Sequence, residues 1–202
     1  VFVGAESDLG IYLDLDCGMH RTGIVPGPEA RAICEAIKEA PNLSLNGLHA
    51  YDGHNHDSDL EKRTTQCEAD FAPVLAFRKE LEAAGIEIPN LVASGSPTFP
   101  IHAQHEDRLC SPGTTVLWDF GYGDSLPDLP FENGAVLLTR IISKPGSNRL
   151  CLDLGHKAVA ADRPQPRARL FGLEQAKPVN HSEEHLTLET DRADSFAVGD
   201  CC

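Results

Sequence analysis

The stretch Leu91-Val-Ala-Ser-Gly-Ser-Pro-Thr-Phe-Pro100 decides the fold that we expect, because an apolar strand here runs into a turn of small and hydroxyl residues. Small residues at a strand end leave backbone N–H groups and hydroxyls free, which suits the binding of an anion such as phosphate. Gly, Ser and Pro also dominate ordinary chain reversals. The turn therefore needs support from the rest of the sequence before it indicates a binding site.

Strand and helix patterns alternate on both sides of this turn. Apolar runs predict strands at residues 11–16, 43–51, 90–93 and 114–118, and helical spacing predicts helices at residues 28–40 and 58–84. The longer helix is predicted to start in a capping box at Ser58 and to bury Leu60, Cys67, Phe71, Leu75 and Leu81. This βαβαβ order predicts parallel strands with helices outside them.

The pattern changes after residue 124. Short strand-like runs follow at residues 135–143, 149–154, 185–190 and 196–198, with turn residues between them. The sequence therefore predicts an α/β domain at residues 1–124 and an all-β domain at residues 125–202.

Charge and cysteine content exclude several classes of protein. The chain has 17 basic and 31 acidic residues, a net charge of -14, and no Lys/Arg cluster that could follow a nucleic-acid backbone. No apolar run approaches the roughly 20 residues that cross a bilayer. The 7 cysteines form no C-x-x-C pair, which is typical of reduced thiols. We expect a cytoplasmic protein that binds neither nucleic acid nor membrane.

Four polar, glycine-containing loops follow the predicted strands, at residues 16–23, 49–57, 94–98 and 119–123. In a parallel α/β barrel the loops at the carboxyl ends of the strands carry the chemistry. Arg21 could clamp a carboxylate or phosphate there, or pair with a neighbouring Asp14 or Asp16. Tyr51 could stack on a flat cofactor, or serve only as a half-buried structural residue.

The second loop is also rich in histidine. His49, His54 and His56 stand near Asp52 and Asp57, a spacing that could hold a transition metal. Zinc held by His54 and His56 would fit a metal-dependent hydrolase. A serine hydrolase and a P-loop enzyme are excluded, because neither G-x-S-x-G nor G-x-x-x-x-G-K-[ST] occurs.

Six segments resemble the D-threonine aldolase and D-serine dehydratase family, in the family's order. They are Asp16-Cys-Gly-Met-His-Arg-Thr-Gly23, Gly47-Leu-His-Ala-Tyr-Asp-Gly-His54, Ser94-Gly-Ser-Pro-Thr98, Pro112-Gly113, Leu152-Asp-Leu-Gly-His-Lys-Ala-Val159 and His181-Ser-Glu-Glu-His185. The resemblance implies a pyridoxal-phosphate enzyme of the alanine-racemase fold, a (β/α)8 TIM-type barrel followed by an all-β domain. It also implies a homodimer.

The resemblance assigns roles to residues of this chain. Arg21 would lie near the cofactor ring or the substrate carboxylate, and Tyr51 would stack on the ring. His185 would either reach the site from the β-domain or serve in domain packing. Ser111 falls where the racemases keep an arginine that faces the ring nitrogen. The phosphate would be held by Gly95, Ser96, Thr98, Gly113 and Thr114.

Two departures from the family pattern stand out. None of the six lysines lies at a strand end, where the family keeps its Schiff-base lysine, and only about four of eight barrel strands are present. We expect the chain to be the second half of a longer enzyme. The divalent metal that the resemblance implies, Zn or Mn, would bind a late His-x-Cys or His-x-Asp that this chain lacks, so no metal ligand is assigned.

The function implied is a lyase acting on D-3-hydroxy amino acids, by retro-aldol cleavage of D-threonine-like substrates or dehydration of D-serine-like ones. The sequence does not choose between the two reactions. A non-catalytic remnant that keeps the fold stays open beside them, as does the less favoured hydrolase.

Overall fold

A computed structural model of the chain describes residues 8–160 and 164–202. The chain divides into two units, Val1–Gly134 and Ala135–Cys202, which are described separately here. The division falls after Gly134 rather than after Asp124, because Leu126 and Leu129 pack with Trp118 of the first unit.

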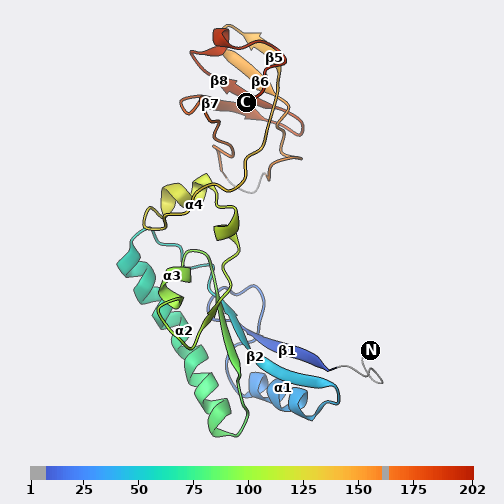
Figure 1. Ribbon diagram of the computed structural model, residues 1–202, viewed down its shortest axis with the longest axis vertical. Helices are drawn as coiled ribbons and strands as arrows, with labels where there is room; N and C mark the ends of the chain where they lie inside the picture. Colours follow the sequence, from blue (N-terminus) through green and yellow to red (C-terminus); the bar gives the residue numbers. More distant parts are fainter. Residues whose placement is uncertain (1–7, 161–163) are drawn as a thin grey trace. The chain divides into compact units, whose positions relative to one another are not determined.

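The first unit is built on a four-stranded parallel sheet whose strands lie in sequence order (Figure 1). The strands are β1 (Leu9–Leu15), β2 (Leu43–Tyr51), β3 (Asn90–Ser94) and β4 (Leu109–Cys110). The connections contain α1 (Pro28–Glu39), α2 (Leu60–Ala83) and the short α3 (Phe99–His102). After β4 come a 3₁₀ helix, η1 (Thr114–Val116), and α4 (Phe120–Ser125). Strands that pair in sequence order with helical connections are the arrangement of a (β/α) barrel wall.

The two faces of this sheet differ in polarity. One face packs on α1 and α2 through a buried apolar cluster that includes Leu15, Leu48, Leu91, Ala30, Cys34, Phe71 and Leu81. The other face carries Asp14 and His49, which stand opposite each other in the β1–β2 register and are only partly buried. In a closed barrel this second face would line the interior, so its polar residues agree with the predicted fold.

The N-cap of helix α2 lies one residue later than the sequence predicts. Its N-cap is Asp59, whose carboxylate accepts hydrogen bonds from the N–H groups of Glu61 and Lys62, and not Ser58. Leu60 is wrongly predicted to be buried, since it is 47% exposed, while Arg63 on the next turn is fully buried. Cys67, Phe71 and Leu81 are buried as predicted, whereas Leu75 is only partly buried.

The fourth predicted strand, at residues 114–118, is wrong. Thr114–Val116 forms the 3₁₀ helix η1, and the backbone N–H of Trp118 donates to the Thr114 carbonyl at 2.6 Å. The strand that pairs with β3 is instead the two-residue β4, in which Cys110 stands opposite Ala93. β-Branched residues favour strands only where a partner is available, and β4 already holds the free edge of β3.

The second unit is an antiparallel sheet of order β5-β6-β8-β7. Its strands are β5 (Ile141–Gly146), β6 (Arg149–Leu152), β7 (Lys177–His181) and β8 (Leu186–Glu189). The sequence missed β7, whose Pro178 weakens a strand pattern, and wrongly predicted a strand at residues 196–198. The all-β character of this region is confirmed.

No helix in the described ranges is long and apolar enough to cross a bilayer.

Candidate active site at the strand ends

The turn after β3 fits only a glycine at residue 95. Gly95 has φ +139°, and a Cβ there would collide with the Asp52 carboxylate and lie 2.6 Å from the Thr98 hydroxyl. A side chain is thus excluded by both the backbone conformation and the neighbouring atoms. The backbone at Gly95 therefore packs directly against the Asp52 side chain.

Backbone donors of this turn are left without partners. No described residue accepts a hydrogen bond from the backbone N–H of Gly95, Ser96 or Thr98. Buried N–H groups are nearly always paired, so donors of this kind are suited to an external acceptor. The turn therefore presents donors that suit an anion such as phosphate.

The loop after β4 lies against this turn. The backbone N–H of Thr114 donates to the Ser96 hydroxyl oxygen at 3.1 Å, so Ser96 keeps its own proton for another acceptor. Ser111 directly follows β4, where its N–H donates to the Ala93 carbonyl. Ser111 and Gly113 are both exposed residues. The structure therefore brings Ser96 and Thr114 into contact, two residues that the resemblance assigns to one phosphate cup.

Arg21 and Tyr51 also meet, across the ends of β1 and β2. The guanidinium carbon of Arg21 lies 4.6 Å from the centre of the Tyr51 ring. The predicted alternative, a pair between Arg21 and Asp14 or Asp16, is not formed, since Asp14 contacts His49 and Asp16 contacts His20.

The loop that carries Arg21 is held by Asp16. Its carboxylate accepts hydrogen bonds from the N–H groups of Gly18 and His20, both at 3.0 Å, and from the His20 ring. These bonds favour the charged form and lower the pKa of Asp16 to about 2.

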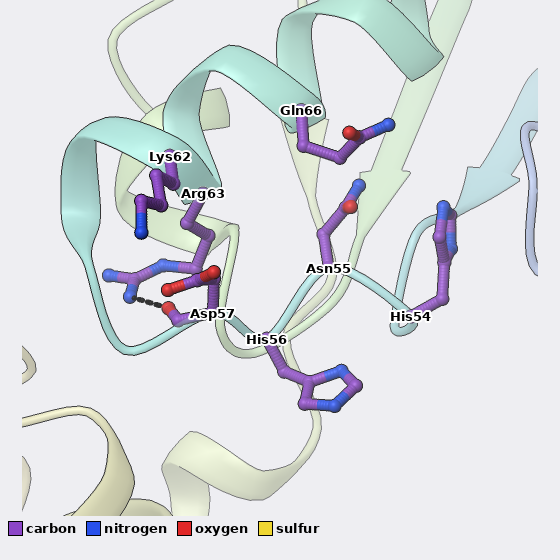
Figure 2. Close-up of a pocket in the computed structure, with 7 residues that line it drawn as sticks. All are labelled: His54, Asn55, His56, Asp57, Lys62, Arg63 and Gln66. Carbon is purple, nitrogen blue, oxygen red and sulfur yellow. Dashed lines mark hydrogen bonds between the residues drawn. The ribbon is translucent and has the colours of Figure 1, made fainter.

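The histidines of the second loop do not converge on a metal. The Nε2 atom of His54 lies 2.8 Å from Asp70, while His56 is exposed. Figure 2 shows their rings pointing in different directions around a cavity of about 480 Å³, which is also lined by Asn55, Asp57, Lys62, Arg63 and Gln66. His49 uses both ring nitrogens on Asp14 and Ser94. The metal site considered for this loop is therefore not formed.

A different cluster lies beneath the turn, and sequence analysis missed it. Asp52, Cys67 and His102 are buried, and their ligand-type atoms lie within 4.8 Å of one another. The Nε2 atom of His102 is 2.8 Å from Asp52 Oδ2, and the Cys67 sulfur is 3.5 Å from the same oxygen. Three such groups from a β2 loop, α2 and α3 carry no spacing signal, because residues 52 and 102 meet only in the folded chain.

The hydrogen bond from Arg108 fixes which nitrogen of His102 carries the proton. Its Nη1 donates to His102 Nδ1 at 2.9 Å. Because arginine has no acceptor, Nδ1 must be unprotonated and Nε2 must carry the proton that it gives to Asp52. Burial, together with the Asp52 charge, also raises the pKa of the Cys67 thiol. A metal needs a free Nε2 and a thiolate, so this cluster is arranged as a hydrogen-bonded network.

The remaining predicted residue, His185, lies in the second unit. It is exposed in the turn between β7 and β8, where its carbonyl accepts a hydrogen bond from the Ser182 N–H at 2.9 Å. Its part in a site stays a prediction.

The chain has six lysines, and the three of the first unit lie on helices rather than at the ends of β1 to β4. Lys38 is on α1, and Lys62 and Lys79 are on α2; the others, in the second unit, are Lys144, Lys157 and Lys177. Lys38 donates to the Gly85 carbonyl, and Lys157 pairs with Glu183 and Glu184. No lysine of the first unit's described part stands among the strand-end residues.

Comparison with known proteins supports the architecture. Residues 3–119 match the family "Alanine racemase, N-terminal domain", and residues 134–202 match the "Putative serine dehydratase domain". Similar proteins include a 3-hydroxy-D-aspartate aldolase of Paracoccus denitrificans (strain Pd 1222), 26% identical over 91% of this chain and 49% of that protein. A D-threonine aldolase of an Arthrobacter species is 26% identical over 94% of this chain and 50% of that protein.

Solved structures show the same fold. The D-threonine aldolase from Filomicrobium marinum superposes with a TM-score of 0.86 at 21% identity, covering 96% of this chain and 53% of that one. The D-threo-3-hydroxyaspartate dehydratase from Delftia sp. HT23 gives a TM-score of 0.71 at 18% identity, over 96% and 57% of the two chains.

The chain spans about half the length of the curated relatives that it matches. The first family model matches the α/β part of the chain, and the second matches the antiparallel unit that follows it. The chain belongs to the alanine racemase N-terminal domain family, here followed by the serine dehydratase type of β-domain.

Proposed function

We propose that this chain is part of a pyridoxal-phosphate-dependent lyase that acts on D-3-hydroxy amino acids. The observation that carries the proposal is the turn after β3, where the N–H groups of Gly95, Ser96 and Thr98 have no acceptor among the described residues. A phosphate group would satisfy these donors together with the Ser96 hydroxyl. Membership of the family and the names of the similar proteins support the same reaction class.

The other strand-end residues would orient cofactor and substrate. Arg21 lies over one face of the Tyr51 ring, so a flat cofactor ring would stack on the other face or displace Arg21. The Arg21 guanidinium is exposed and can pair with the substrate carboxylate. Ser111 would stand near the cofactor's ring nitrogen, as the resemblance implies, and a hydroxyl there would leave that nitrogen without the cationic partner of a racemase.

Bound pyridoxal phosphate supplies an electron sink for the negative charge that develops at the substrate α-carbon. A divalent metal, Zn or Mn, would bind the substrate 3-hydroxyl in the whole enzyme, and no ligand for it is assigned within this chain. His185 would contribute from the β-domain. A homodimer, which sedimentation velocity can test, also belongs to this proposal.

The substrate class follows from the similar proteins. Their names include aldolases for D-threonine and 3-hydroxy-D-aspartate and a dehydratase for D-threo-3-hydroxyaspartate. All three substrates are D-amino acids with a hydroxyl on the β-carbon. We place the substrate of this protein in that class and leave aldol cleavage and dehydration as two outcomes of one test.

The test supplies D-threonine, D-serine and D-threo-3-hydroxyaspartate to the purified intact protein with pyridoxal phosphate and a divalent metal. Glycine with an aldehyde identifies the aldolase, and a 2-oxo acid with ammonia identifies the dehydratase. L-Threonine is the control and is expected to give no product. If pyridoxal phosphate binds but no D-substrate reacts, the protein is a non-catalytic member of the fold and the proposed reaction is wrong.

A further inference from the structure

The buried Asp52 carboxylate links two segments of the first unit, the turn after β3 and helix α3. Asp52 is 1% exposed and directly follows β2, where its N–H donates to the Ser94 carbonyl at the end of β3. Its Oδ1 accepts the Thr98 hydroxyl proton at 2.7 Å, and its Oδ2 accepts the Nε2 proton of His102 at 2.8 Å. One carboxylate therefore ties the turn after β3 to the end of α3.

This arrangement divides the donors of the turn into two sets. The Thr98 hydroxyl donates to Asp52, so its proton is not available to a ligand. The backbone N–H groups of Gly95, Ser96 and Thr98 have no described acceptor. Asp52 accepts the hydrogen bond of the Thr98 hydroxyl and packs against Gly95 where a Cβ would stand. Both contacts limit the conformations that the turn can adopt.

A carboxylate this close to an anion site would repel the anion unless its charge were balanced. Arg108 supplies part of the balance through His102, since its Nη1 lies 2.9 Å from His102 Nδ1. Arg108 is itself buried, at 7% exposed, and its guanidinium lies over the Phe71 ring. Arg108 also pairs with the more exposed Glu68, 3.5 Å from its Nη2, so it offsets only part of the charge of the buried Asp52 carboxylate behind the turn.

We propose that Asp52, held by His102 and Arg108, is a positioning residue that sets the phosphate-binding turn in its anion-accepting conformation through the Thr98 hydroxyl. This inference rests on the proposed function, because it takes the ligand of the turn to be the cofactor phosphate. It requires no contact between Asp52 and the cofactor.

The experiment compares equilibrium binding of pyridoxal phosphate and of pyridoxal, which lacks the phosphate, to the intact protein. Thr98→Val keeps the shape of the side chain but removes the hydroxyl, whereas Thr98→Ser keeps the hydroxyl. We expect Thr98→Val to weaken pyridoxal phosphate binding by about tenfold and pyridoxal binding by less than about twofold, since one buried charge-assisted hydrogen bond is lost. Thr98→Ser should restore the preference for the phosphate form.

Asp52→Asn tests the other end of the link. The asparagine carbonyl can still accept the Thr98 proton, but its NH₂ group would face the Nε2–H of His102, and two donors cannot pair. We expect the same selective loss of phosphate binding. A thermal unfolding scan shows whether the variant is folded, and the Thr98 pair carries the test if it is not.

The outcomes separate the two proposals. If the wild-type protein does not bind pyridoxal phosphate, the proposed function is wrong. If it binds but Thr98→Val keeps the full preference for phosphate, or loses both ligands equally, the positioning role of Asp52 is wrong. A metal content that falls by one ion per chain in Cys67→Ser would also overturn it, because the cluster would then be a metal site.

Discussion

The guanidinium of Arg21 lies over one face of the Tyr51 ring, with 4.6 Å between its carbon and the ring centre. A planar ligand can therefore stack only on the other face, unless Arg21 moves. Arg21 is exposed and Tyr51 is partly buried, so the pair is placed at the edge of the site and contributes little to folding.

Replacing Arg21 with alanine should distinguish a role in substrate binding from a role in folding. The exposed cation–π contact contributes about 0.5–1 kcal/mol, so the free energy of unfolding should change little. If Arg21 binds the substrate carboxylate, kcat/KM with the active D-substrate should fall roughly 10- to 100-fold. Arg31→Ala, which removes an exposed α1 arginine paired with Glu35, is the matched control. Equal kcat/KM in both variants would contradict the assigned role.

Gly95→Ala should weaken cofactor binding and also lower the stability of the fold. The new Cβ must push the Asp52 carboxylate away or distort the turn. We expect at least about a tenfold rise in the Kd for pyridoxal phosphate, with about 1–3 kcal/mol lost from the free energy of unfolding. Equilibrium titration and urea unfolding measure the two effects.

Gly85→Ala is the control for backbone strain. Gly85 also has a left-handed conformation, φ +76°, but nothing lies within 4 Å of the position of its Cβ. It should cost about 1 kcal/mol of stability and leave the Kd unchanged. A similar Kd in Gly95→Ala and the wild type would show that the turn does not bind the cofactor.

The buried pair of Arg63 and Asp128 should contribute strongly to stability. The Arg63 side chain is fully buried, and Asp128 is 24% exposed. Asp128→Ala leaves a buried guanidinium without its charge partner and should cost about 3–5 kcal/mol. Arg63→Met should cost less, because the remaining carboxylate can still contact water.

Arg78 and Asp107 form the matched surface pair, with 3.1 Å between nitrogen and oxygen and Asp107 54% exposed. Asp107→Ala should cost no more than about 1 kcal/mol. Urea unfolding of the three variants gives the comparison. If Asp128→Ala costs no more than Asp107→Ala, the Arg63 pair is not a buried stabilising contact.

The low pKa of Asp16 predicts how the stability of its loop depends on pH. Backbone hydrogen bonds from Gly18 and His20 lower that pKa to about 2, against about 3.9 for an unfolded chain. A depressed carboxylate pKa adds stability that is complete above about pH 4 and is lost as the pH falls toward 2. Asp16→Asn keeps an acceptor without the charge.

The wild type should therefore exceed Asp16→Asn in free energy of unfolding near neutral pH, and the difference should shrink as the pH falls below about 4. Urea unfolding at stepped pH measures it. A difference that stays constant down to the acid-unfolding limit would show that the Asp16 charge does not hold the loop.

Local patterns in the sequence determined most of the architecture. The parallel strands before residue 94, the two long helices and the all-β region follow from hydrophobic periodicity, which reflects which face of each element is buried. The Gly95 turn was found because strand ends of one sheet share an edge, which chain order alone implies. Ser111 and Thr114 were identified only by the family resemblance, since the sequence pattern predicted a strand at residues 114–118.

Only the tertiary structure decided the rest. Residues 114–116 form a 3₁₀ helix rather than a strand because the two-residue β4 takes the edge of β3. Arg63 is buried because Asp128 reaches it from 65 positions further along the chain. The network of Asp52, His102 and Arg108 likewise has no sequence signature. Side chains pair there through space, and a buried polar group is stabilised only by partners that folding brings to it.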